Sequence, residues 1–353
     1  MRFVTFSLFS VFIVLCILST NPVHASKVEF TSQGICLVDR KPFFPIGIWL
    51  YELNSNVMAE IHDKQFNTIV GGFKPDQLDY IHQHGIKAIC FTGEEWIKAA
   101  QNHPALLAWY LTDEPESHNK TPEGERARYL ALKKSDPNHP IGLCHFLFEA
   151  LSKYKDACDF TLTDVYPVTA NRDVPLVNVG IHVAEARRIH GPDWANWAFI
   201  QVFGGPDADG GKWAQPLPHE VRCMAYIALV HGATGILYFS YWQKAPDTWN
   251  SLRDLNRELH RIIPWLVAKG DELNIKSSNP QVHVRARKVK TNAIILAVNT
   301  SPVFCNTTFE IESEGTRALK ELSRNRLLRM LRGRFSDSFG PYEAKAYVWG
   351  QEP

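Results

Sequence analysis

Beyond its first 25 residues the 353-residue sequence has no long apolar run, and it has almost no net charge. Its 38 Lys and Arg are balanced by 37 Asp and Glu, so no strongly basic surface of the kind that binds nucleic acid or an anionic membrane is expected. No segment after residue 25 approaches the roughly 18 consecutive apolar residues of a membrane-spanning helix. Nucleic-acid binding and membrane insertion are therefore not predicted.

Short motifs of metal, nucleophile and phosphate chemistry are also missing. The chain has seven Cys but no C-x-x-C pair, and no two His residues stand at a ligand spacing. It lacks the G-x-S-x-G turn of serine hydrolases and a Gly-rich phosphate loop after its first strand. We therefore expect no metal ion and no organic cofactor. Apart from Cys16, the six remaining Cys are irregularly spaced, which leaves open whether a disulfide forms.

The first 25 residues have the features of a secretion signal. Arg2 provides positive charge, residues 3–18 form an apolar stretch, and the small residues of a cleavage site lie at 23–25. Cleavage after Ala25 would start the mature chain at Ser26. We therefore predict a soluble protein that is secreted or periplasmic, and the sequence does not indicate its oligomeric state.

Eight short β-rich runs alternate along the chain with segments that have helical spacing or helix start and stop signals. The helical segments are expected at residues 74–84, 121–134, 175–190, 218–231 and 249–268, several of them followed by a capping Gly. Regular alternation with short connections predicts a parallel (β/α)8 barrel over about residues 42–269. The eight strands are expected at residues 43–50, 66–71, 86–91, 106–112, 141–146, 160–166, 197–203 and 235–240.

The segments that flank the barrel predict β structure. Residues 28–44 indicate a β-hairpin that covers the bottom of the barrel. Residues 282–291, 293–299, 307–311 and 344–349 alternate like strands of a small all-β domain. The predicted organisation is a signal at 1–25, the barrel with its hairpin at 26–272 and a β-sandwich-like domain at 273–353, with residues 273–281 as the linker. The basic run at 324–334 is expected to be the solvated face of a strand pair.

Acidic, aromatic and amide side chains gather where the predicted strands end. In a (β/α)8 barrel these ends carry the functional residues. Two carboxyl groups that flank one bond suit glycoside hydrolysis, and aromatic faces suit sugar rings. The strand ends carry, in chain order, Trp49 and Tyr51; Glu94, Glu95 and Trp96; Asp113, Glu114 and Glu116; His145; Asp164 and Tyr166; Gln201; and Ser240, Tyr241 and Trp242.

Four stretches resemble the clan A glycoside hydrolases, a large group of retaining (β/α)8 enzymes. "TDEP" at residues 112–115 is similar to the Asn-Glu-Pro or Asp-Glu-Pro at the end of their fourth strand, which implies that Glu114 is the proton donor. "RKPFFPIGIW" resembles their first strand, "HEVRCMAYIALVHGATGILYFSYW" their eighth, and "FSDSFGPYEAKAYVW" the last strand of the β domain that often follows. The resemblance extends over nearly the whole mature chain.

The chain departs from this pattern at the seventh strand, where the family has a nucleophilic Glu and this sequence has Gln201. An amide cannot form the glycosyl ester that a carboxylate forms. One hypothesis is inversion, with Glu114 as acid and water activated by Asp164 or by an acid of the following loop, Asp207 or Asp209.

A second hypothesis is assistance by the substrate. Adjacent Asp and Glu resemble the family 20 hexosaminidases, which implies that Asp113 orients a 2-acetamido group while Tyr166 or Tyr241 hydrogen-bonds it. A third hypothesis is a catalytically inactive carbohydrate-binding protein.

Each candidate also has a structural alternative. Asp113 could cap the following turn, Asp164 could bond a neighbouring strand end and Glu95 could start a helix, while Glu116 is expected to be solvated. The catalytic candidates are Glu114, Asp113 and Asp164, and the substrate-binding candidates are Trp49, Tyr51, Glu95, His145, Tyr166, Gln201, Tyr241 and Trp242.

Overall fold

The computed structural model describes residues 25–242, 244–312 and 315–353. The predicted secretion signal, apart from its last residue, lies outside these ranges. None of the helices within them is both long and apolar enough to cross a membrane. The six Cys of the described ranges are all unpaired, and only Cys305 is not buried, so none of them forms a disulfide there.

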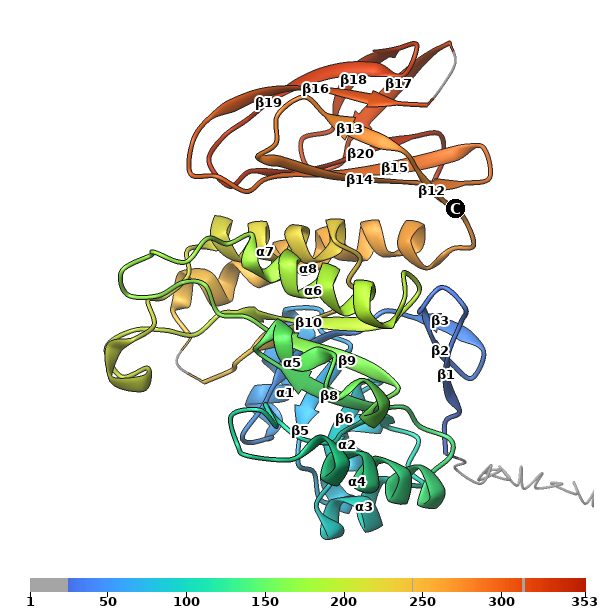
Figure 1. The fold of residues 1–353 in the computed structure, drawn as a ribbon, viewed down its shortest axis with the longest axis vertical. Helices are drawn as coiled ribbons and strands as arrows, with labels where there is room; N and C mark the ends of the chain where they lie inside the picture. Colours follow the sequence, from blue (N-terminus) through green and yellow to red (C-terminus); the bar gives the residue numbers. More distant parts are fainter. Residues whose placement is uncertain (1–24, 243, 313–314) are drawn as a thin grey trace, which may run out of the picture.

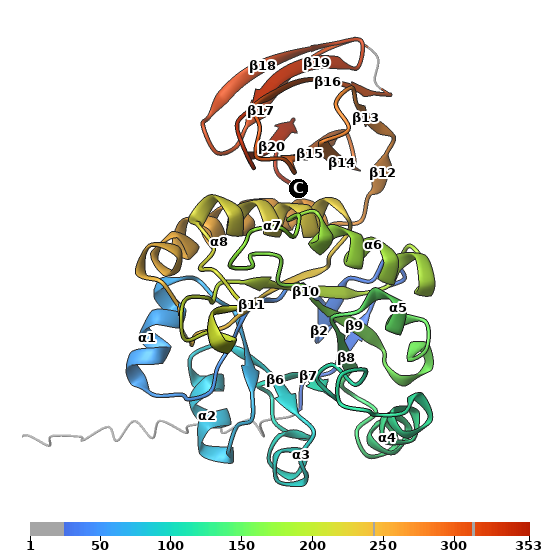
Figure 2. The same cartoon turned by 60° about the vertical axis from the view of Figure 1, so that its left-hand side comes forward.

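Eight parallel strands close into a barrel, which confirms the predicted fold class (Figure 2). Each observed strand lies within or close to its predicted range. In chain order they are β4 (Ile46–Trp49), β5 (Thr68–Gly71), β6 (Lys87–Phe91), β7 (Leu106–Tyr110), β8 (Ile141–His145), β9 (Phe160–Asp164), β10 (Asn196–Gln201) and β11 (Gly235–Phe239).

Helices cover the outside of this barrel (Figures 1 and 2). Five of them match the predicted helical segments. The helices are α1 (Ser55–Asp63), α2 (Pro75–Gln83), α3 (Glu94–Ala100), α4 (Pro122–Ser135), α5 (Phe148–Leu151), α6 (Asn178–His190), α7 (Pro218–Val230) and α8 (Pro246–Val267).

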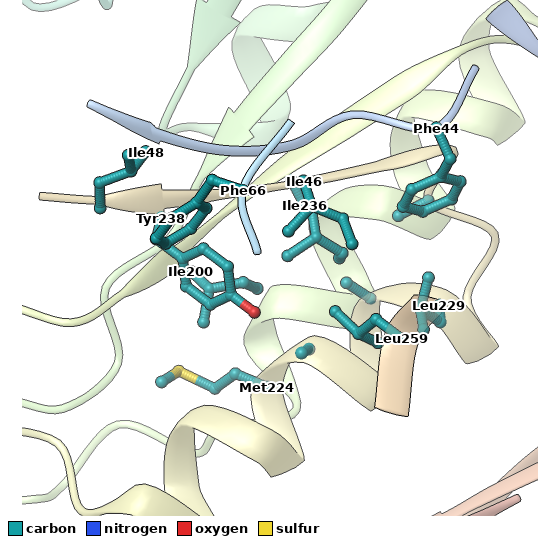
Figure 3. Close-up of a cluster of buried hydrophobic side chains, with 14 of the residues drawn as sticks. Phe44, Ile46, Ile48, Phe66, Ile200, Met224, Leu229, Ile236, Tyr238 and Leu259 are labelled. Atoms are coloured by element: carbon teal, nitrogen blue, oxygen red, sulfur yellow. The ribbon is translucent and has the colours of Figure 1, made fainter. Parts of the chain in front are cut away.

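The barrel strands are buried on both faces, which is why they are nearly continuous apolar runs. Alternate residues therefore belong to different cores. On β10, Trp197 and Phe199 fill the barrel interior, whereas Ala198 and Ile200 pack against the helices. Figure 3 shows part of the core between the strands and helices α7 and α8, with Ile46, Ile200, Ile236, Tyr238, Met224, Leu229 and Leu259.

A three-stranded antiparallel sheet closes the bottom of the barrel, where the sequence predicted a two-stranded hairpin. It consists of β1 (Val28–Phe30), β2 (Cys36–Val38) and β3 (Lys41–Phe43). The ring centroid of Phe30 lies 5.5 Å from that of Phe160 and 6.1 Å from that of Trp197, at the N-terminal ends of the barrel strands. The opposite end of the barrel remains open for the functional site.

The C-terminal part is an antiparallel sheet of nine strands in the described ranges. The two edge strands of this sheet are residues 271–273 and 275–277, which only Asn274 separates in the chain. The sheet therefore curls until its two edges meet. The face of β14, β15 and β20 lies over α7 and α8 (Figure 1). The strands are β12 (Asp271–Leu273), β13 (Ile275–Ser277), β14 (Val282–Val289), β15 (Asn292–Asn299), β16 (Cys305–Ile311), β17 (Thr316–Glu321), β18 (Arg326–Leu331), β19 (Arg334–Phe339) and β20 (Ala344–Trp349).

One hydrophobic cluster extends from the barrel into the C-terminal sheet, which also has a core of its own. Apolar residues of β15 and β20 belong to the same buried cluster as α7 and α8. Three Arg side chains add hydrogen bonds across the contact: Arg222 donates to the carbonyl of Ala344 at 2.6 Å, Arg285 to that of Leu229 at 3.0 Å, and Arg287 to that of Trp265 at 2.8 Å. The two parts are therefore expected to unfold as one unit.

Candidate active site

A cavity of about 590 Å³ opens at the C-terminal ends of the barrel strands. It brings together six of the predicted residues: Trp49, Asp113, Glu114, Asp164, Tyr166 and Asp209. Aromatic rings make up most of the remaining wall. The other lining residues are Tyr110, Phe146, Val165, Phe199, Phe203, Lys212, Trp213 and Phe239.

The turn after β7 directs two adjacent carboxyl groups into this cavity. Successive side chains of a strand point to opposite faces, so neighbours in an extended chain would not share one cavity. Glu114 has a φ of 40°, in the left-handed region, which breaks that alternation after Asp113. The amide and hydroxyl of Ser117 both donate to the carbonyl of Glu114 at 3.0 Å and hold the turn closed.

A buried polar network supports the same turn from behind. The hydroxyl of Thr112 donates to Glu125 at 2.6 Å, and Arg128 donates to the Glu125 carboxylate at 3.0 Å and to the carbonyl of Leu111 at 3.1 Å. Burying Glu125 is tolerated because its charge is paired with Arg128 and both its oxygens accept hydrogen bonds. The first turn of α4 thus fixes the end of β7.

Asp164, at the end of β9, lies on the floor of the cavity and is only 5% exposed. Its carboxyl is close enough to donate a hydrogen bond to Glu114, and it interacts with the thiol of Cys144 on β8. Its Oδ1 atom has no partner among the described residues. Asp113 accepts a hydrogen bond from the Tyr110 hydroxyl at 2.6 Å. Three carboxyl groups therefore converge at one point.

Burial raises the pKa of all three carboxyls, and the charges of neighbouring carboxylates add to the shifts of Asp164 and Glu114. Desolvation raises the pKa of Asp164 well above its usual value, and the charges of Glu114 and Asp113 raise it further. The pKa of Glu114 is raised by burial and then by Asp113, although Ser117 and Asp164 oppose the shift. Asp113 reaches solvent through the cavity mouth, yet the surrounding walls desolvate it and raise its pKa against the effect of the Tyr110 hydroxyl. The cluster retains a proton at a pH at which an isolated carboxyl has lost it.

Asp113, Cys144 and Asp164 are also close enough to hold a metal ion, because their potential ligand atoms all lie within 4.8 Å of one another. Burial raises the pKa of the Cys144 thiol well above its usual value, and the charges of the two Asp residues add to this. A metal would therefore have to displace protons from both Cys144 and Asp164 before it could bind. The arrangement is better suited to holding and transferring protons.

Glu116 and His145 lie outside the cavity and form a structural anchor. Glu116 accepts hydrogen bonds from the backbone amides of Phe146 at 3.0 Å and Leu147 at 3.2 Å, and its other oxygen lies 3.0 Å from Nδ1 of His145. Burial raises the pKa of Glu116, but these hydrogen bonds and the neighbouring imidazole outweigh it, so the net shift is downward. The prediction that Glu116 is solvated was wrong, because its side chain is only 9% exposed.

Gln201 does not line the cavity either, although β10 ends at this residue. It is fully buried, and its carbonyl oxygen accepts from the amide of Val168 at 2.9 Å. Its NH2 group donates to the carbonyl oxygens of Val168 at 3.1 Å and Phe203 at 3.2 Å. The amide side chain thus joins the loops that follow β9 and β10.

Four further candidates are not among the residues that line the cavity, although Tyr51 lies near enough to Asp113 for that charge to raise its pKa. Tyr51 and Trp242 are 65% and 63% exposed at the surface, and Glu95 is exposed in the first turn of α3. Tyr241 packs edge-on against Trp249, with ring centroids 5.3 Å apart. None of these four lines the cavity.

Trp213 is one of the cavity residues that the sequence analysis missed. It lies in the long loop after β10, and its ring centroid is 5.9 Å from that of Phe203 and 6.1 Å from that of Tyr166. Lys212 lies over the same indole, with its Nζ atom 4.7 Å from the ring centroid. The sequence did contain a signal for Trp213, because it lies in the loop after the seventh predicted strand, and such loops carry the functional residues of a (β/α)8 barrel.

No protein-family model and no curated protein sequence matches the chain, whereas solved structures match its fold. A GH30 endoxylanase from Clostridium papyrosolvens C71 has a TM-score of 0.57 at 12% identity, over 93% of this chain and 98% of that one. An alpha-amylase from Geobacillus thermoleovorans has a TM-score of 0.62 at 10% identity, with 92% and 100% covered. A GH27 β-L-arabinopyranosidase from Geobacillus stearothermophilus has 0.59 at 9%, with 87% and 97% covered. The chain has the fold of barrel glycoside hydrolases, as the resemblance in sequence implied.

Proposed function

We propose that the protein is a secreted or periplasmic glycoside hydrolase in which Glu114 protonates the leaving oxygen. The observation that carries the proposal is the cluster of three carboxyls in an aromatic-lined cavity at the catalytic end of the barrel. Carboxyl groups with raised pKa values suit proton donation, and rings such as Trp213 suit the apolar faces of sugars. The glycosidase fold of the solved neighbours supports the same reaction class.

In this proposal Glu114 carries the proton that it delivers, and Asp164 stays protonated throughout. The substrate oxygen takes the proton from Glu114 as the glycosidic bond breaks, and the neutral Asp164 carboxyl at the buried floor donates a hydrogen bond to the Glu114 carboxylate that is left. Asp164 does not activate water. A general base has to be ionised, whereas burial and the neighbouring charges raise the pKa of Asp164 well above its usual value.

Asp113 then acts as the second carboxyl group. It is adjacent to Glu114 in the chain, lines the same cavity, and its charge raises the pKa of Glu114. Ionised Asp113 stabilises the positive charge at the anomeric carbon, either directly or through a substrate 2-acetamido group that it orients. We therefore expect retention of the anomeric configuration, which NMR of the first product measures. Inversion would instead assign the base to Asp209, the other acid that lines the cavity.

The test compares hydrolysis of aryl glycosides and oligosaccharides by the unaltered protein and by Glu114→Gln. We expect the substitution to lower kcat by about 10²- to 10⁴-fold, because it removes the donated proton and leaves the shape unchanged. Glu123→Gln on α4 is the matched control, since Glu123 is exposed outside the cavity, and it should retain full activity. Calorimetry should show that Glu114→Gln still binds the substrate.

The alternative function is sugar binding without cleavage. It is favoured by Gln201, which leaves no carboxylate at the end of β10. If the unaltered protein bound sugars but hydrolysed none of the panel, the hydrolase proposal would be abandoned for this one.

A further inference from the structure

A second cavity, of about 400 Å³, adjoins the candidate active site. Trp49, Tyr110 and Asp113 line both cavities, so the two meet at the catalytic carboxyls. The second cavity extends over the ends of β6 and β7, where Phe91 and Trp96 form much of its wall. A volume of this size is within the range of sites that hold small organic molecules.

Trp96 is held in this wall by two glycines. A Cβ atom at Gly72 would lie 2.5 Å from the indole, and a Cβ atom at Gly93 would also lie 2.5 Å from it. Any larger residue at either position would displace the ring. The indole therefore packs against bare backbone just beyond the ends of two strands, which fixes a large apolar surface in one orientation.

Aromatic rings connect this indole to the catalytic cavity. The ring centroids of Trp49 and Phe91 are 5.0 Å apart, and those of Phe91 and Trp96 are 5.6 Å apart. Arg128 provides a guanidinium at the edge of the wall, with 45% of its side chain exposed. Aromatic surface with a few charged groups at its border is the pattern of a site that stacks a ring and hydrogen-bonds its hydroxyls.

We propose that this second cavity, called the Trp96 cavity below, is a binding subsite for a second sugar ring. The inference rests on the proposed function and deepens it: the substrate is a disaccharide or longer chain that spans both cavities and is cleaved beside Asp113. Trp96 stacks on the apolar face of the second ring. A monosaccharide occupies only the deeper cavity, lined by Asp164, Tyr166 and Trp213.

The test uses Glu114→Gln protein, so that binding is measured without turnover. Xylose, glucose and N-acetylglucosamine, with their β-1,4-linked chains of two to four units, and α-1,4-linked glucose chains are titrated by calorimetry. We expect at least one series to bind roughly tenfold more tightly with two units than with one. In the doubly substituted protein, Trp96→Ala should remove this gain and leave monosaccharide affinity unchanged.

Two variants control for general effects. Trp96→Phe keeps an aromatic face and should retain most of the gain. Phe304→Ala removes an exposed aromatic from the C-terminal sheet and should change nothing. Equal affinity for one and two units, a gain that survives Trp96→Ala, or no binding in any series would each overturn the subsite. Hydrolysis by the unaltered protein that is indifferent to Trp96→Ala would leave the hydrolase standing without the subsite. Binding that depends on Trp96, without hydrolysis by the unaltered protein, would support the subsite and overturn the hydrolase proposal.

Discussion

At the residue scale, the structural role of Gln201 depends on its side-chain amide, which donates and accepts hydrogen bonds at the same time. Glutamate at this position would bring a carboxylate to the carbonyls of Val168 and Phe203 and leave them without a donor. We expect Gln201→Glu to lower the free energy of unfolding by about 3 kcal/mol at pH 7, as an uncompensated buried charge does.

Urea unfolding measures this change. The loss should shrink at low pH, because burial raises the pKa of the new carboxyl and protonation restores a donor. Gln83→Glu on the exposed end of α2 is the control and should change stability by less than about 0.5 kcal/mol. If Gln201→Glu left stability unchanged or increased activity, residue 201 would have a catalytic role and not a structural one.

The sequence could identify which residues follow the strand ends, but not which way their side chains turn. Asp113, Glu114 and Asp164 were predicted because the barrel rule selects the C-terminal ends. Glu116 follows Glu114 by two residues, yet it turns away from the cavity to bind the amides after β8. That difference depends on the left-handed conformation of Glu114, which no residue pattern in the sequence indicated.

At the element scale, Glu116 joins the loop after β7 to the loop after β8. Glu116→Gln keeps the shape of the side chain but replaces two strong acceptors by one weaker acceptor and an NH2 group. We expect the substitution to lower the free energy of unfolding by about 1–3 kcal/mol and to speed up hydrogen exchange at the amides of Phe146 and Leu147. Exchange measured by mass spectrometry tests this. Glu123→Gln serves again as the matched control, and slow exchange in both variants would rule out the anchor.

Elements were predicted well where burial shaped their sequence. The barrel strands are apolar on both faces, and the matching helices carry clear start and stop residues. The strand β17 was missed, because "TRALKE" is mostly solvent-exposed and charged residues interrupt the alternation. The exposed strands β18 and β19 were predicted only as a strand pair at the basic run 324–334, without bounds, and the structure confirms that pair. The single turn of α5 is too short to give a helical period.

At the scale of the whole molecule, a pair of histidines lies between the barrel and the C-terminal sheet. Nε2 of His231, which caps the end of α7, is 2.8 Å from Nδ1 of His283 on β14. Burial first, then the charges of His283 and Arg187, lower the pKa of His231 to about 4, and burial lowers the pKa of His283. Protonating His231 would place a new charge beside Arg187 within the shared contact.

This contact should make the folded protein sensitive to acid. An unfolded His titrates near pH 6.5, so between about pH 6.5 and pH 4 the unfolded chain binds more protons at His231 than the folded one does. The contribution is fully present above pH 6.5 and is lost as pH falls toward 4, by on the order of 2 kcal/mol. In urea unfolding measured from pH 4.5 to 7.5, His231→Gln should flatten this slope, whereas His62→Gln on the exposed face of α1 should not. Parallel slopes for the unaltered protein and His231→Gln would mean that the contact between barrel and sheet does not respond to protonation at this pair.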